Sequence, residues 1–295
     1  MSSPVMTAPR AGSPEPWSWR TMPAWQRAML GVVLLELGVL YAPTVAWLWE
    51  RWTMSVWHNA HGLLIPLVVG YFIHQELRTL QAAPAVPSRA GFLILIPALA
   101  LQALDAGMHT ELLAAATIPF VLIGLSLLML GQTRTKAILI PLLFLMFALP
   151  IPLALTEQIH WQLRLIVTAA VAGVVPLLGI PVFAEGTNLH LSRGVLEVAD
   201  ACSGFSTLYA ATAVACLTAY STPSTVRRAL VLIVAAPLAI ASNILRVILL
   251  TVLVVWQGGW VLESYLHPLS GMMTFALALP IIFWLGGDMK RMAAS

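Results

Sequence analysis

The stretch ALVLIVAAPLAIASNILRVILLTVLVV, residues 229–255, carries one ionisable side chain, Arg246. A helix of this length is long enough to cross the roughly 30 Å hydrocarbon core of a bilayer. Counted from Ala229, Arg246 lies about 25 Å along that helix, inside the outer membrane boundary. A charge at this depth is costly and marks a functional site by default. Asn243, one turn earlier on the same face, favours an inward-facing site over a side chain that only extends to the interface.

The composition of the whole chain also indicates a membrane environment. Of 295 residues, 60% are hydrophobic and 9% are charged, whereas about a quarter of the residues of a soluble domain are charged. We therefore predict an all-α polytopic membrane protein. The net charge of +3 follows from the distribution of basic residues between the two membrane faces. It gives no nucleic-acid signal.

Apolar runs predict about eight transmembrane helices. A further run, 157–179, is amphipathic in its first half and contains Pro176 and Gly179 in its second. We interpret it as an interfacial or re-entrant helix, because most basic residues then lie on one side, which the positive-inside rule makes cytoplasmic. The eight predicted spans lie at residues 28–49, 62–77, 91–108, 112–130, 137–155, 203–220, 229–255 and 268–286.

The N-terminal segment differs from the rest of the chain. Residues 1–27 are rich in Pro and Ser and contain no apolar run, so we expect a flexible cytoplasmic tail. Residues 28–295 are expected to form a single integral membrane domain.

One stretch has strand character, PVFAEGTNLHLSRGVLEVADACSG at 181–204. Leu189 alternates with polar neighbours, Arg193-Gly194 offers a tight turn, and Leu196 and Val198 resume the alternation. We predict a small extracytoplasmic β-hairpin that leads into the next helix.

Cys202 opens that helix together with Ser203 and Gly204. Unpaired N–H groups and the positive end of the helix dipole lower the pKa of a thiol in this position. Asp200 lies two residues earlier. The alternative is an inert buried thiol, the usual state of a free cysteine, and we assign that structural role to Cys216.

His267 directly precedes Pro268, a residue suited to the first helical position of the last span. We therefore expect its side chain at the depth of Cys202 and Arg246. Each of the three has a structural explanation singly: an inert thiol, a snorkelling arginine, an interfacial capping histidine. Their convergence on one membrane face predicts a cysteine nucleophile with its partners.

A second polar cluster lies in WHNAHGLLIPL, residues 57–67, where His58 and His61 are three residues apart near Glu50 and Asp105. A metal site here would lack a fixed third ligand. Interfacial hydrogen bonding and contact with a substrate are the alternatives, and we predict neither a metal nor another cofactor.

Several motifs together resemble the exosortase/archaeosortase family. They are ACSGF before an apolar helix, NILRV within the next span, and a His at the start of the last span. The similarity continues in HGLLIPLVVGYFI (61–73), in the segment 148–191 and in GVLEVADACSG (194–204), so it covers most of the chain beyond residue 55. Phe205 stands where the family usually has Leu.

This resemblance implies a bacterial inner-membrane cysteine peptidase or transpeptidase whose site faces the periplasm. Its partners would be the lipid bilayer and exported proteins with a C-terminal sorting tail of the PEP-CTERM type: a short motif, a transmembrane helix and a basic cluster. In that family the Cys is the presumed nucleophile and the Arg and His its partners, which corresponds to Cys202, Arg246 and His267. Supporting or substrate-binding positions are Asn243, Asp200, Ser203, Gly204 and His61.

The residue chemistry agrees with this assignment. His267 would take the thiol proton and later protonate the leaving amine, and Asp200 would orient it. Arg246 would donate hydrogen bonds to the oxyanion or hold a substrate carboxylate. The alternative function is a non-enzymatic subunit of an envelope polysaccharide or protein export or transport system, although we find none of the inverted repeats typical of transporters.

Overall fold

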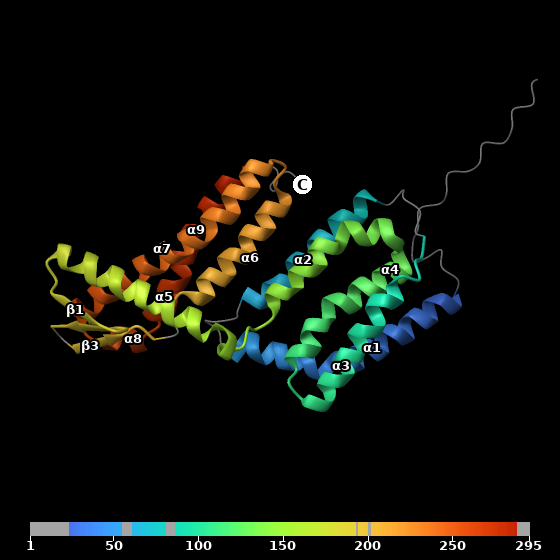
Figure 1. Cartoon of the computed structure of the whole chain (residues 1–295), viewed down its shortest axis with the longest axis horizontal. Helices are drawn as coiled ribbons and strands as arrows, with labels where there is room; N and C mark the ends of the chain where they lie inside the picture. Colours follow the sequence, from blue (N-terminus) through green and yellow to red (C-terminus); the bar gives the residue numbers. More distant parts are fainter. Residues whose placement is uncertain (1–23, 55–60, 81–85, 193, 200–201, 288–295) are drawn as a thin grey trace, which may run out of the picture. The chain divides into compact units, whose positions relative to one another are not determined.

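The computed structural model describes residues 24–54, 61–80, 86–192, 194–199 and 202–287 (Figure 1). The chain divides into two compact units. Unit 1 comprises Met1–Glu50 and Leu63–Leu149, and unit 2 comprises Arg51–Gly62 and Pro150–Ser295. Most of the predicted N-terminal tail lies outside the described residues, and its last four residues already belong to the first helix.

Unit 1 is built from long apolar helices: α1 (Ala24–Met54) as far as Glu50, α2 (His61–Thr79) from Leu63 onward, α3 (Gly91–Met108) and α4 (Leu112–Leu143), followed by the 3₁₀ turn η2 (Phe144–Ala148). The boundaries of α3 are those predicted for the third span. Hydroxyl groups join α1 to α4, with Tyr41 Oη 2.6 Å from Thr117 Oγ1. Such interhelical hydrogen bonds replace the water that a membrane lacks.

A kink at Gly131 divides α4 into two helical segments, and the first corresponds to the predicted span at 112–130. The span predicted at 137–155 is not one helix, since α4 ends at Leu143, η2 ends at Ala148 and the next helix begins at Leu153. Gly131 has φ 81° and ψ 177°, values outside the helical region that favour glycine. The carbonyl of Val86 lies where a Cβ on Gly131 would be. The close approach of the 86–88 segment therefore requires glycine at the kink.

Unit 2 contains α5 (Leu153–Val174), η3 (Val175–Leu178), a three-stranded sheet, α6 (Phe205–Ser221), α7 (Thr225–Gln257), α8 (Trp260–Glu263) and α9 (Leu266–Gly286). Helices α6, α7 and α9 lie side by side in a bundle (Figure 1). Alanines dominate the buried contact between them, which allows the backbones to approach closely. The buried residues of this contact are Ala211, Ala215, Val231, Ala235, Ala239 and Ile282.

The sheet has the order β1 (Val182–Glu185), β2 (Asn188–Leu191) and β3 (Gly194–Glu197), with both pairs antiparallel. The predicted hairpin is confirmed as β2–β3, with Leu189 opposite Leu196. Its turn lies one residue earlier than expected, because Gly194 already pairs with Leu191. The extra strand, β1, was not predicted; its signal was the Val-Phe pair ahead of Gly186, which has φ 59°.

In the described part of the chain, six helices are long and apolar enough to cross a membrane. This supports a multi-pass membrane protein, while the predicted count of eight is not confirmed. Helices α2 and α6 are not among the six, and α4 with η2 counts once. Ala154–Leu178, in the run predicted to be interfacial or re-entrant, is one of the six. The interpretation of this run as interfacial or re-entrant therefore rests on the distribution of basic residues only.

Candidate active site

The turn before α6 holds Cys202 in a fixed backbone conformation. The Cys202 N–H donates to Ala199 O at 2.8 Å, and the Phe205 N–H donates to Ser203 Oγ at 3.3 Å. Gly204 between them has φ 84°, a left-handed conformation that glycine adopts without a steric penalty. The sequence Cys-Ser-Gly thus folds as a tight turn that ends where α6 begins.

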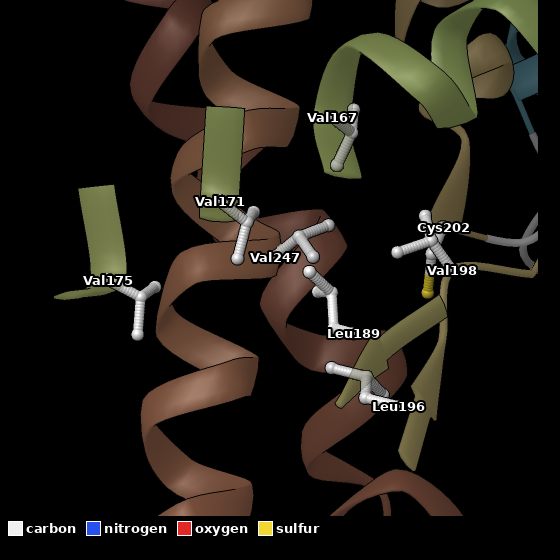
Figure 2. Packing of buried hydrophobic residues seen from close by; sticks show 8 residues of the cluster. All are labelled: Val167, Val171, Val175, Leu189, Leu196, Val198, Cys202 and Val247. Atoms are coloured by element: carbon white, nitrogen blue, oxygen red, sulfur yellow. The ribbon is translucent and has the colours of Figure 1, made fainter. Parts of the chain in front are cut away.

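Cys202 is buried at 6% exposure and packs into a hydrophobic cluster between the sheet and the helices. Figure 2 shows it with Leu189 and Val198 from the sheet segment, Val167 from α5 and Val247 from α7. The sheet therefore packs directly against the residue that carries the thiol. This explains why the strand-like stretch directly precedes the Cys202 motif in the sequence.

Asn243 joins α7 to the Cys202 turn. Its Nδ2 donates to Cys202 O at 2.9 Å, and its side chain is 2% exposed. Gly204 packs against the same amide, since a Cβ there would lie 2.5 Å from Asn243 Cγ. Among the described residues, Asn243 Oδ1 has no hydrogen-bond partner.

Arg246 lies on α7 nearly one turn after Asn243 and is also buried, at 6% exposure. Its Nε donates to Ser270 Oγ on α9 at 3.1 Å. Gly271 leaves room for the guanidinium, whose Cζ would be 3.2 Å from a Cβ at that position. Asn243 and Arg246 therefore face the protein interior, as predicted for this side of the helix.

The electrostatic environment of Cys202 differs from the expectation for a helix start. Burial raises the pKa of the Cys202 thiol, and the positive charge of Arg246 partly offsets this rise. Loss of water therefore outweighs the neighbouring charge. Proton removal by a base is then required for the thiolate to form near neutral pH.

The structure places His267 one residue inside the last helix, since α9 begins at Leu266 and not at Pro268. Ser270, three residues further along α9, contacts Arg246. The side chain of His267 and all of Asp200 lie outside the described residues, and their roles remain predictions.

His160 is a site residue that was not predicted. Its Nδ1 lies 2.9 Å from Ser203 Oγ, and it is 7% exposed. On α5, Glu157 is exposed, whereas Thr156, His160 and Thr168 are buried. Their spacings of four and eight residues place them on one face of the helix, and this spacing was the available signal.

His61 contacts the same region through aromatic rings. Its ring lies 5.3 Å from that of Tyr209, which stacks on Phe205 at 6.3 Å, and Phe205 lies 4.6 Å from His160. His58 lies outside the described residues. Within the described part of the chain, no three His, Cys, Asp or Glu side chains group as metal ligands.

Residues 49–284 match the family model described as transmembrane exosortase. This range includes Cys202, Arg246 and His267 and confirms the resemblance that the sequence motifs indicate. No curated protein and no solved structure matches the chain.

Proposed function

The chain belongs to the transmembrane exosortase family, and we propose that it is a membrane-embedded cysteine peptidase or transpeptidase. Its substrates are exported proteins whose C-terminal sorting tail contains a motif, a membrane helix and a basic cluster. The site faces the periplasmic side of the bacterial inner membrane. One observation carries this proposal: the backbone carbonyl of Cys202, whose thiol is buried, accepts a hydrogen bond from Asn243 on α7, and the same helix presents the buried Arg246, whose charge acts on that thiol.

The reaction follows from these groups. The Cys202 thiolate attacks the carbonyl carbon of the scissile peptide bond, and His267 receives the thiol proton. The guanidinium of Arg246 stabilises the oxyanion that develops on the carbonyl. When the C–N bond breaks, His267 returns the proton to the leaving amine, and a thioester remains on Cys202. Water or an amine then attacks the thioester and releases the product.

Arg246 suits this role because of its geometry and its surroundings. A planar guanidinium offers five N–H donors, of which Nε is engaged with Ser270. Burial strengthens its interaction with a developing negative charge, since little water is present to screen it. Ser270 fixes the orientation of the fork from α9.

The decisive experiment compares the two cysteines. Cys202→Ala should abolish cleavage of a co-expressed tailed substrate, whereas Cys216→Ala is the matched control and should retain it. Both variants must reach the wild-type membrane level. Cleavage by Cys202→Ala above background would exclude covalent catalysis by Cys202, whereas equal cleavage with and without the wild-type protein would favour the non-enzymatic export or transport subunit.

The orientation of the site is tested by labelling. A membrane-impermeant maleimide applied to intact spheroplasts should modify Cys202 in the Cys216→Ala variant, with membrane-permeant maleimide as the positive control. If Cys202 is labelled only after the inner membrane is ruptured, the site faces the cytoplasm and the proposed orientation is wrong.

A further inference from the structure

We propose that His160 is a positioning residue that holds the Cys202 turn through Ser203. The claim about catalysis rests on the proposed function, whereas the claim about the turn does not. His160 projects from α5, a helix separate from those that carry Cys202, Arg246 and His267. Its Nδ1 lies 2.9 Å from Ser203 Oγ, and both side chains are buried.

The hydroxyl of Ser203 links His160 to the backbone of the turn. Besides contacting His160, Ser203 Oγ accepts the Phe205 N–H at 3.3 Å. A serine hydroxyl can serve both contacts, because it has one proton and two lone pairs. The hydroxyl thereby connects Ser203 to Phe205 across Gly204, and glycine is the residue type with the most backbone freedom.

The turn is thus bonded from two helices. Asn243 of α7 holds the carbonyl of Cys202, and His160 of α5 holds the side chain of the next residue. These two bonds lie on neighbouring residues of the turn, one on the carbonyl of Cys202 and one on the hydroxyl of Ser203. Without His160, Ser203 loses its bond to α5, while the bond from Asn243 of α7 to Cys202 is retained.

The ring of His160 also packs against another ring, and this contact can be tested separately from the hydrogen bond. It lies 4.6 Å from the ring of Phe205, and the rings of Tyr209 and His61 extend this row. A histidine that only fills space would act through this ring contact. A positioning histidine acts through Nδ1, and substitutions can retain either contact independently.

Three variants separate these contacts. His160→Phe keeps a ring against Phe205 and removes the bond to Ser203, whereas His160→Asn places an amide near the position of Nδ1 and removes the ring. Ser203→Ala removes the hydroxyl with a smaller change. The control is Thr168→Val on the same buried face of α5, because Thr168 Oγ1 has no hydrogen-bond partner among the described residues and Val has nearly the same shape.

Two measurements are made in the Cys216→Ala background, where Cys202 is the single thiol. We expect His160→Phe and Ser203→Ala to lower kcat for tail cleavage by about tenfold, roughly 1.4 kcal/mol, with little change in KM. Alkylation of Cys202 by iodoacetamide should become faster in both, since a loosened turn exposes the thiol. His160→Asn and Thr168→Val should stay within about threefold of the parent in both measurements.

Loss of folding would also lower cleavage and speed alkylation, so the membrane level and the Tm in micelles of each variant must match those of the parent. If His160→Phe does not accumulate, Ser203→Ala decides the result. The proposal is overturned if Ser203→Ala leaves both rates within about threefold, or if His160→Asn is as defective as His160→Phe. Alkylation reports on the turn even if Cys202→Ala still cleaves substrate, so failure of the proposed function is recognised separately.

Discussion

Asn243 on α7 packs directly against Gly204 in the Cys202 turn. The Asn243 amide donates to the carbonyl of Cys202, and a Cβ on Gly204 would lie 2.5 Å from Asn243 Cγ. The polar residue that the sequence suggested as a companion of Arg246 therefore acts on the Cys202 turn. Two motifs about 40 residues apart, ACSGF and NILRV, form one structural unit.

Gly204→Ala tests this fit. The left-handed φ of 84° costs a residue with a Cβ about 1–2 kcal/mol, and the contact with Asn243 adds to that cost. We expect a lower Tm in detergent micelles and loss of tail cleavage. Gly173→Ala is the matched control, since a Cβ at Gly173 meets open space. Wild-type cleavage by Gly204→Ala would show that the turn tolerates a side chain.

Arg246→Lys separates charge from geometry. Lysine keeps a positive charge but lacks the planar fork that can hold Ser270 and an oxyanion together. Loss of one oxyanion donor costs about 2.7–4 kcal/mol, roughly 100- to 1000-fold in rate, and we expect a loss on this scale at unchanged membrane abundance. The measurement is a processing time course normalised to protein level, with Ser270→Ala as the milder comparison.

A loss smaller than about tenfold for Arg246→Lys, or roughly 1.4 kcal/mol, would reduce Arg246 to a structural residue. Ser270→Ala should cost less than Arg246→Lys, because it removes an orienting contact and leaves the guanidinium in place. Equal losses in both variants would indicate that Arg246 supports cleavage through its bond to Ser270 on α9 and not by stabilising the oxyanion.

The pH dependence of Cys202 alkylation follows from its surroundings. Burial raises the pKa of the thiol and Arg246 partly offsets the rise, so the alkylation rate of the Cys216→Ala protein should increase with a midpoint above about pH 8.5, the value of an ordinary cysteine. Arg246→Gln removes the opposing charge and should move the midpoint further upward. The measurement is the rate of iodoacetamide modification against pH.

The opposite result is also informative. A midpoint below about pH 8.5 would mean that the helix dipole or His267 outweighs burial, as the position of Cys202 at a helix start suggested. An unchanged midpoint in Arg246→Gln would exclude a direct charge interaction between Arg246 and the thiol.

Local signals in the sequence predicted the elements that carry the site. Apolar runs placed α3 and α7 because a membrane helix is defined by length and hydrophobicity, and period-two alternation predicted β2 and β3. The strand β1 was missed because Val182–Glu185 is too short to show a pattern before its partner is known. Its pairing with β2 is a tertiary contact.

The partners of the site residues were harder to predict than their identities. Cys202 and Arg246 stand out because a thiol motif and a buried charge are rare in such surroundings. His160 does not, since its role depends on a bond to Ser203, 43 residues away. Asn243 was placed on the correct face by helical periodicity, but its bond to Cys202 depends on how α6 and α7 pack.

The last prediction concerns the sheet as a support for the site. Leu189 is fully buried, lies opposite Leu196 and belongs to the cluster that contains Cys202 (Figure 2). Removing a buried leucine side chain costs about 2–5 kcal/mol. We therefore expect Leu189→Ala to lower the Tm in micelles, whereas Val195→Ala, on the exposed face of β3 at 59% exposure, should leave it nearly unchanged.

Cleavage activity of the same two variants shows whether the sheet only stabilises the fold or also takes part in the reaction. Leu189 contributes no polar group, so cleavage by Leu189→Ala should fall only in proportion to the fraction of folded protein. The pH midpoint of Cys202 alkylation should not rise above that of the parent protein, because the cavity leaves the charge of Arg246 in place. The measurement is cleavage per folded molecule at a temperature well below the Tm. A lowered rate at full folding would show that the sheet also shapes the substrate pocket, and an unchanged Tm would mean that the strands contribute nothing to the stability of unit 2.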